Sequence, residues 1–254
     1  SGGRLIVLRP DSTLPIARVV ATRMREMPLP VRLRYTQNVF HANRADEGRH
    51  NETTQSGVEL LGAAGMRADI ELLVTALGAF KALGLEGAQI ELGHVGFFKA
   101  LMSEIPFEDG EDEDVRRCVE YKNYAALGDI LKKYGDSRTE ALGKLPQLFG
   151  GEEVLARAEK MTQNLEAKRI LEYLGELYGA LCGMGYRESV EIDLGMVHHI
   201  NYYTGLVFRG YITGSGSTVL TGGRYDGLLS EFGYDIPATG FAINVDQLLE
   251  GSAP

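Results

Sequence analysis

The stretch YYTGLVFRGYITGSGSTVLTGG, Tyr202–Gly223, decides the fold class of this 254-residue chain. Apolar and polar side chains alternate on both sides of the Gly-Ser-Gly turn, which predicts two antiparallel strands joined by a tight connection. Two earlier runs, residues 31–40 and 52–62, alternate in the same way and predict a second hairpin across a polar loop. Further strands are predicted over residues 4–10, 88–98, 190–195 and 237–245.

Between the two groups of strands, residues 98–187 contain no convincing strand and indicate a succession of helices. The acidic run Glu108–Asp114 is predicted to be a hydrated loop rather than a cation site, because like charges in series repel. Helices are also predicted over residues 11–24 and 68–85. The order strands, helices, strands predicts an α+β fold, an antiparallel sheet flanked by helices, with residues 1–97 and 188–254 as the core and 98–187 as a helical insertion.

Composition excludes several classes of protein. The chain is 44% hydrophobic, enough for a substantial core, and its formal charge of −9 argues against a general nucleic-acid binder. Cys118 and Cys182 lack CxxC spacing and are expected to be reduced thiols. Since no apolar run approaches the ~18 residues of a membrane span, we expect a soluble, cytoplasmic protein with no membrane partner.

Three glycine-rich spots, residues 62–65, 214–217 and 221–227, lack the spacing of a phosphate-binding loop and are predicted to be turns. In the third, the glycines would allow close backbone approach, Arg224 offers a bidentate fork, and Asp226 could cap the next helix.

The adjacent pair His198–His199 has no partner at metal-ligand spacing, and neighbours on a strand point to opposite faces. No metal site and no nucleophile elbow are predicted.

A set of polar residues is more informative: Asp11, Gln55, Glu59, Tyr202 and Tyr203. Gln55 and Glu59 lie four apart on one predicted strand and share a face with Gly57 between them. Carboxylates and an amide on a face that also bears small residues suit a small cationic or amine ligand. The same residues would also fit the ordinary solvent-exposed face of a sheet.

Five segments in order resemble the histidyl-tRNA synthetase family, which includes the regulatory subunit of ATP phosphoribosyltransferase, and they bracket a helical insertion in the place where the family has one. LRPDSTLPIAR resembles the family's LRPEGT segment, and MVHHINYYTGLVFRGY its LVRGLDYYTxTVFE segment. The other three are VFHANRADEGRHNETTQSGVELLG, similar to motif 2 and the FxQxGxE strand, LTGGRYDGLLSEFG, similar to GGGRYDxL, and ATGFAINVDQLLE, similar to motif 3. The resemblance implies a class II aminoacyl-tRNA synthetase-like fold.

The resemblance also implies that no residue of this chain is catalytic. His41, His198 and Gln247 stand where the synthetase pattern has arginines that bind ATP or activate the histidine carboxylate. Neutral histidines cannot replace bidentate guanidinium groups, and loss of such a donor costs about 3 kcal/mol of transition-state stabilisation. Aminoacylation is therefore not expected.

The amino-acid pocket, by contrast, resembles the family's. Gln55 and Glu59 match positions that recognise the ammonium and imidazole groups of histidine, and Tyr202 and Tyr203 match the tyrosine pair beside the imidazole. Asp11 takes the place of a longer glutamate. A pocket of this kind without phosphate-binding arginines indicates a sensor rather than an enzyme.

The sequences of several of these segments are more similar to the regulatory subunit than to the synthetase. The resemblance then implies a non-catalytic protein that activates a short-form phosphoribosyltransferase subunit and takes part in histidine feedback, with no cofactor and no tRNA partner. The family's first motif, which builds the dimer interface, would precede residue 4, so self-association is expected of the full-length protein. Two alternatives remain open: a degenerate synthetase core that still activates histidine with ATP, and a stand-alone amino-acid binding module.

Overall fold

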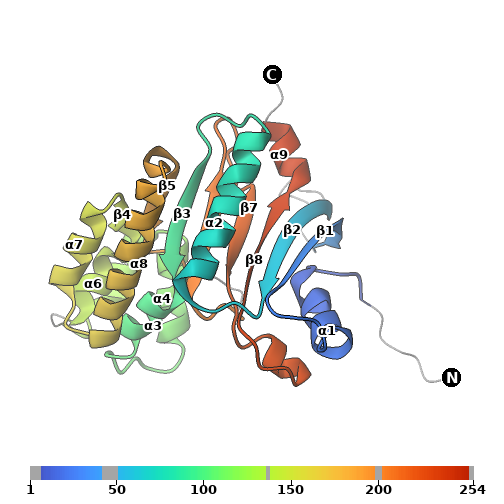
Figure 1. Cartoon of the computed structure of the whole chain (residues 1–254). Coiled ribbons are helices and arrows are strands. Elements are labelled where there is room, and N and C mark those ends of the chain that lie inside the picture. Colours follow the sequence, from blue (N-terminus) through green and yellow to red (C-terminus); the bar gives the residue numbers. More distant parts are fainter. Residues whose placement is uncertain (1–6, 42–50, 136–137, 198–201, 252–254) are drawn as a thin grey trace.

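A computed structural model describes residues 7–41, 51–135, 138–197 and 202–251, and within these ranges eight strands form one sheet (Figure 1). Their order across the sheet is β1-β2-β8-β7-β6-β3-β5-β4. The strands are β1 (Val31–Phe40), β2 (Glu52–Leu61), β3 (Gln89–His94), β4 (Phe149–Gly150), β5 (Val190–Asp193), β6 (Leu206–Tyr211), β7 (Leu220–Arg224) and β8 (Ala238–Asn244).

Neighbouring strands are antiparallel except for β3 and β5, which run parallel. The two predicted hairpins are confirmed, β1 with β2 and β6 with β7. Parallel neighbours need a crossover connection, and here the helical stretch between β3 and β5 supplies it. The predicted α+β class with a mainly antiparallel sheet is therefore confirmed.

The helices gather at different parts of the sheet (Figure 1). In this view α2 lies across one face, the helices of the crossover stand at the end that carries β5 and β4, and α1 lies at the opposite end near β1 and β2. The helices are α1 (Thr13–Arg23), α2 (Gly65–Ala82), α3 (Val95–Met102), α4 (Glu111–Glu120), α5 (Tyr124–Leu131), α6 (Arg138–Lys144), α7 (Glu153–Met161), α8 (Leu165–Gly183) and α9 (Val245–Gly251).

Two hydrophobic clusters lie on opposite faces of the sheet. The larger one joins Phe80 of α2, Leu92 of β3 and Leu174 of α8, so sheet and crossover helices share one core. The smaller one joins Val20 of α1 to Tyr203 and Tyr225. Alternation along β6 shows the separation, since Phe208 belongs to the larger cluster and its neighbour Val207 to the smaller.

Several local predictions were wrong or only partly right. Residues 7–10 form no strand, while residues 4–6 lie outside the described residues. The strand predicted over residues 88–98 ends at His94, whose side chain accepts a hydrogen bond from the Gly96 amide and caps α3. Residues 149–150 add a short strand where none was expected. Residues 221–223 were predicted both as the end of a strand and as part of a turn, and the structure confirms the strand, which continues to Arg224 in β7.

The acidic run is only partly a loop, because Glu111–Asp114 form the first turn of α4. Free amide groups and the helix dipole stabilise carboxylates at this end of a helix, an effect that the prediction of mutual repulsion left out. Of the helices in the described ranges, none combines the length and apolar character needed to cross a bilayer.

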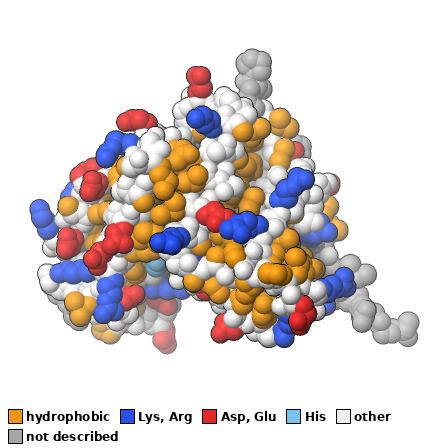
Figure 2. All heavy atoms as spheres, in the orientation of Figure 1, with side chains coloured by type: hydrophobic (Ala, Val, Ile, Leu, Met, Phe, Trp, Pro, Cys, Tyr) orange, Lys and Arg blue, Asp and Glu red, His pale blue; other side chains and the backbone are white. Residues whose placement is uncertain are grey.

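Acidic and basic side chains are interspersed on the face shown in Figure 2, and no extended basic patch appears among the described residues there. This face therefore lacks the electrostatic footprint of a nucleic-acid binder.

Candidate functional site

A cavity of about 420 Å³ lies on the side of the sheet that α1 covers. Four of the five predicted ligand residues line it, namely Asp11, Gln55, Tyr202 and Tyr203. The other lining residues are Pro10, Thr13, Tyr35, His41, Thr221, Tyr225, Gly240, Phe241 and Ala242. The lining is thus rich in hydroxyl groups, and it contains no lysine or arginine among the described residues.

Glu59, the fifth predicted residue, lies directly beneath this lining and is 1% exposed. The Thr13 hydroxyl donates to Glu59 Oε1 over 2.8 Å, and the Tyr225 hydroxyl donates to Oε2. Gly240 lies opposite Glu59 in the β2–β8 register, and a Cβ at Gly240 would lie 1.8 Å from Oε2. Only glycine at this position lets the carboxylate lie across β8.

Burial dominates the electrostatics of Glu59 and raises the pKa of its carboxyl group to about 7. The hydrogen bonds from Tyr225 and Thr13 lower this pKa and the nearby Asp11 raises it, but both effects are smaller than that of burial. Within the described part of the chain, Glu59 forms no ion pair with a basic side chain. Among the described residues, the carboxylate is held by the neutral hydroxyl groups of Thr13 and Tyr225.

The tyrosines form an aromatic group around the cavity. Tyr202 lies 5.0 Å from Tyr203 and 5.7 Å from Tyr225, measured between ring centroids. Burial raises the pKa of Tyr35, Tyr202, Tyr203 and Tyr225 well above that of an exposed tyrosine, so all four hydroxyl groups stay protonated. Each hydroxyl can then donate one hydrogen bond and accept others.

Asp11 is partly engaged in starting α1, because its Oδ1 accepts a hydrogen bond from the Leu14 amide over 3.0 Å. Ser12, at the N-cap position of α1, is fully buried and its hydroxyl oxygen accepts from Gln37 Nε2 over 2.6 Å. The segment before α1 is thereby fixed against the sheet, which places Asp11 at the cavity. Gln55 enters the same cavity from β2, between β1 and β8.

The three positions that replace the synthetase arginines do not all meet at the cavity. His41 lines it from the end of β1. Gln247 lies on α9, where its backbone amide donates to Asn244 Oδ1 over 3.2 Å, and is not part of the lining. His198 and its neighbour His199 lie outside the described residues.

Sequence reasoning missed Thr13, Tyr35, Tyr225 and Gly240. A signal for Tyr35 exists, since it lies opposite Gly57 in the β1–β2 register and a Cβ at Gly57 would lie 2.4 Å from the Tyr35 ring. A glycine opposite a tyrosine leaves room for the ring to lie over the neighbouring strand. Tyr225 follows a motif arginine, but nothing local in the sequence shows that it reaches Glu59.

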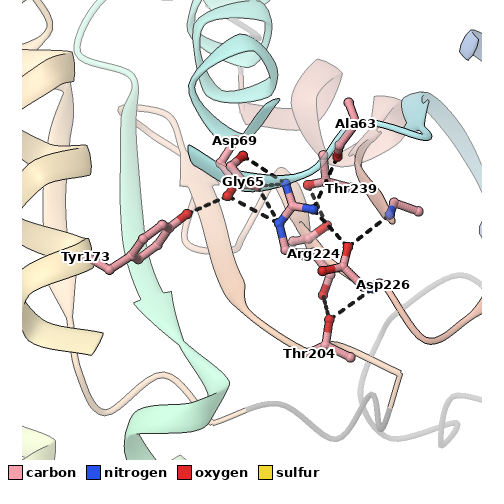
Figure 3. Close-up of polar contacts among 10 residues, drawn as sticks. Ala63, Gly65, Asp69, Tyr173, Thr204, Arg224, Asp226 and Thr239 are labelled. Carbon is pink, nitrogen blue, oxygen red and sulfur yellow. Dashed lines mark hydrogen bonds and ion pairs between the residues drawn. The ribbon is translucent and has the colours of Figure 1, made fainter. Parts of the chain in front are cut away.

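The bidentate fork predicted at Arg224 exists, but its partner is part of the protein (Figure 3). Arg224 is 7% exposed and pairs with Asp69 of α2 over 2.7 Å and with Asp226 over 2.8 Å. Tyr173 of α8 donates to the same Asp69 over 2.5 Å. Arg224 is thus a structural link between β7, α2 and α8 and not a ligand-binding group.

Two other predictions for this segment have opposite outcomes. Asp226 does not cap a helix, because its Oδ1 accepts from Arg224 and from the Ala238 amide. Close backbone approach at the two glycines is confirmed, since a Cβ at Gly222 would lie 2.4 Å from Phe208 and one at Gly223 would lie 2.6 Å from the Leu206 carbonyl oxygen.

A larger groove of about 1050 Å³ lies outside α1 and shares Pro10 and Asp11 with the cavity. Its lining is mainly apolar and includes exposed Val7 and Leu8. Of these two hollows, the smaller cavity is the one in which hydroxyl, amide and carboxylate groups of described residues converge, so it is the candidate site. The described residues contain no cluster of three or more groups suited to a metal ion, and Cys118 and Cys182 are free thiols.

Comparison with known proteins places this geometry in a family. The family model for histidyl-tRNA synthetase matches residues 1–248. An ATP phosphoribosyltransferase regulatory subunit of Clostridium acetobutylicum is 45% identical over 251 residues, which make up 97% of this chain and 62% of the relative. The chain therefore spans about three fifths of the length of this relative.

Solved structures agree with the match. The crystal structure of an ATP phosphoribosyltransferase regulatory subunit/histidyl-tRNA synthetase from Bacillus halodurans superposes with a TM-score of 0.87 at 36% identity, over 97% of this chain and 65% of that one. The ATP phosphoribosyl transferase (HisG:HisZ) complex from Thermotoga maritima contains a chain of the same fold, with a TM-score of 0.71 at 24% identity over 93% and 80% of the two chains.

Proposed function

The chain belongs to the histidyl-tRNA synthetase family, and we propose that it acts as the non-catalytic regulatory subunit of ATP phosphoribosyltransferase. In this role it activates a short-form catalytic subunit in the first step of histidine biosynthesis and contributes to histidine feedback. The 45% identical relative from Clostridium acetobutylicum carries this name. The proposal extends that name to a chain that spans 62% of the relative's length.

The lining of the cavity carries the proposal. A synthetase must hold a triphosphate and stabilise charge on phosphorus, for which arginine forks are the suited groups. The described lining offers hydroxyls, an amide and the carboxylate of Asp11, with His41 as its one basic residue. This arrangement favours the ammonium group of an amino acid over a polyanion.

Histidine is the proposed occupant of the cavity. In the proposed site Asp11 and Gln55 bind its ammonium group close to the hydroxyls that the buried Glu59 holds, while Tyr202 and Tyr203 lie beside its side chain. The residues that would bind the ammonium group lie on separate elements, so a ligand would connect the segment before α1 with β2.

The proposed partner is the short catalytic phosphoribosyltransferase chain. A structure of similar fold is that of an ATP phosphoribosyl transferase (HisG:HisZ) complex from Thermotoga maritima, in which two different subunits are joined. A cytoplasmic location forms part of the proposal, because histidine biosynthesis starts from ATP and the two cysteines are free thiols.

Reconstitution tests the proposal. A purified short-form phosphoribosyltransferase chain would be assayed with ATP and phosphoribosyl pyrophosphate, alone and after mixing with this protein in its full length. We expect activity to rise on mixing, and histidine to reduce it. Unchanged activity would contradict the regulatory role. ATP–pyrophosphate exchange with histidine serves as the second assay, and measurable exchange by this protein alone would assign it to the synthetases instead.

A further inference from the structure

The hydrogen bonds around Glu59 determine what the cavity presents to a ligand. Glu59 accepts from the hydroxyls of Thr13 and Tyr225, and both of these residues also line the cavity. A hydroxyl group has one proton and two lone pairs. When both protons point toward Glu59, only lone pairs remain for a ligand on the cavity side.

We propose that Glu59 is a positioning residue whose ionised form turns the Thr13 and Tyr225 hydroxyls into acceptors toward the cavity, so that binding of an ammonium-bearing amino acid is coupled to loss of a proton from Glu59. The proposal rests on the assignment of this cavity as the amino-acid site. A protonated Glu59 must place its own proton on one of the two hydroxyl oxygens. That hydroxyl then turns its own proton away from Glu59 and toward the cavity. In this orientation the hydroxyl no longer accepts a hydrogen bond from an N–H group of the ligand.

The charges near Glu59 support this coupling. Asp11 faces it from the segment before α1, His41 lines the same cavity at the end of β1, and the hydroxyls of Tyr35, Tyr202 and Tyr203 stay neutral. Burial brings the pKa of Glu59 to about 7, so both of its forms are populated near neutral pH. A ligand ammonium group entering this cavity favours the ionised form.

Calorimetric titration over pH 5.5–8.5 tests the proposal. The ligands are histidine and 1,2,4-triazolylalanine, whose ring is far less basic, so that the pH dependence of the second ligand belongs to the protein. We expect the affinity for both to rise with pH, by roughly thirtyfold between pH 5.5 and 8 if only the ionised form binds. Titration of 1,2,4-triazolylalanine in two buffers of different ionisation enthalpy is expected to show proton release at pH 6 and none at pH 8.

Two variants identify the group that titrates. Glu59→Gln is expected to bind with weak affinity that does not change with pH. His41→Gln removes the imidazole from the cavity lining, and the pH dependence that persists in this variant is the part expected from Glu59. The buffer comparison on the unmodified protein needs no variant and therefore stands even if Glu59→Gln folds poorly.

The outcomes separate this inference from the function on which it rests. Binding that is equally tight from pH 5.5 to 8.5, or a pH dependence that disappears in His41→Gln, would overturn the role of Glu59 and leave the pocket assignment standing. Absence of histidine binding at every pH would overturn the pocket assignment and the coupling with it.

Discussion

Glu59 is a carboxyl group that folding removes from water, and its effect on stability depends on pH. Burial raises its pKa from 4.5 to about 7 in the folded state, so the folded protein binds this proton more tightly than the unfolded chain. The stabilisation is fully present below the unfolded pKa and is lost as pH rises through the folded pKa. Glu59 therefore makes the folded protein less stable at pH 8 than at pH 5.5.

Replacement by glutamine removes this dependence. Between pH 5.5 and 8, we expect the unmodified protein to lose about 2 kcal/mol of unfolding free energy relative to Glu59→Gln. Urea denaturation of both proteins at several pH values measures the difference, which cancels the contributions of all other titrating groups. Parallel stability profiles for the two proteins would show that Glu59 titrates at its ordinary pKa.

The partners of Glu59 show where residue-level prediction stops. Alternation along residues 52–62 places Gln55 and Glu59 on one face, and the structure confirms a strand there with Gln55 at the cavity. Gly240 contacts Glu59 only because β2 pairs with β8, which follows it by more than 170 residues in the sequence. Registers between distant strands depend on the packing of the whole sheet, so local pattern predicted neither Gly240 nor Tyr225.

Among the elements, β7, α2 and α8 depend on one buried ion pair. Arg224 is 7% and Asp69 1% exposed, and Tyr173 adds a hydrogen bond from α8. Removal of one partner leaves a buried charge without compensation, so we expect Asp69→Asn or Arg224→Met to cost about 3–5 kcal/mol of unfolding free energy. Chemical denaturation measures the loss.

Arg32→Gln is the matched control for this ion pair. Arg32 pairs with Glu71 over 2.6 Å on the surface, where both side chains are largely exposed. Water screens such a pair, and we expect its loss to cost under about 1 kcal/mol. Equal losses for the surface pair and the buried pair would contradict the role assigned to Arg224.

Element types were easier to predict than element ends. The helices of α2 and α8 extend over long periodic segments, and the structure confirms both. Capping decided the boundaries that were wrong, as at His94, where a side-chain hydrogen bond ends the strand and begins α3. Such a contact is a property of one side chain in one conformation, which hydrophobic periodicity does not report.

At the scale of the whole molecule, the order of strands and helices predicted the class of fold, but not that β3 and β5 become neighbours. These strands pair in parallel although about 95 residues separate them. The intervening helices form the crossover and contribute to the same hydrophobic core as the sheet. Residues 98–187, which the sequence predicts to be an insertion, therefore pack against the sheet and share its hydrophobic core.

This shared core predicts that sheet and crossover helices unfold together. Leu174 of α8 is 0% exposed in the common core, and we expect Leu174→Ala to cost about 3–4 kcal/mol of unfolding free energy. Six of the chain's twelve tyrosines lie within residues 98–187, so fluorescence would mix the two parts, and amide hydrogen exchange over a range of denaturant concentrations is used instead to follow β1 and β2 at the cavity separately from α8. Both exchange transitions should shift by the same amount to lower denaturant.

Leu165→Ala, at an exposed position where the same helix begins, is the matched control. Leu165 is 73% exposed, so its truncation creates no cavity and should change stability by no more than about 0.5 kcal/mol. If Leu174→Ala moved the exchange transition of α8 while that of β1 and β2 stayed in place, residues 98–187 would form an independent unit. Coincident transitions would instead show that the cavity depends on α8 for its stability. The face of the sheet that binds a ligand would then unfold together with the helices packed on the other face.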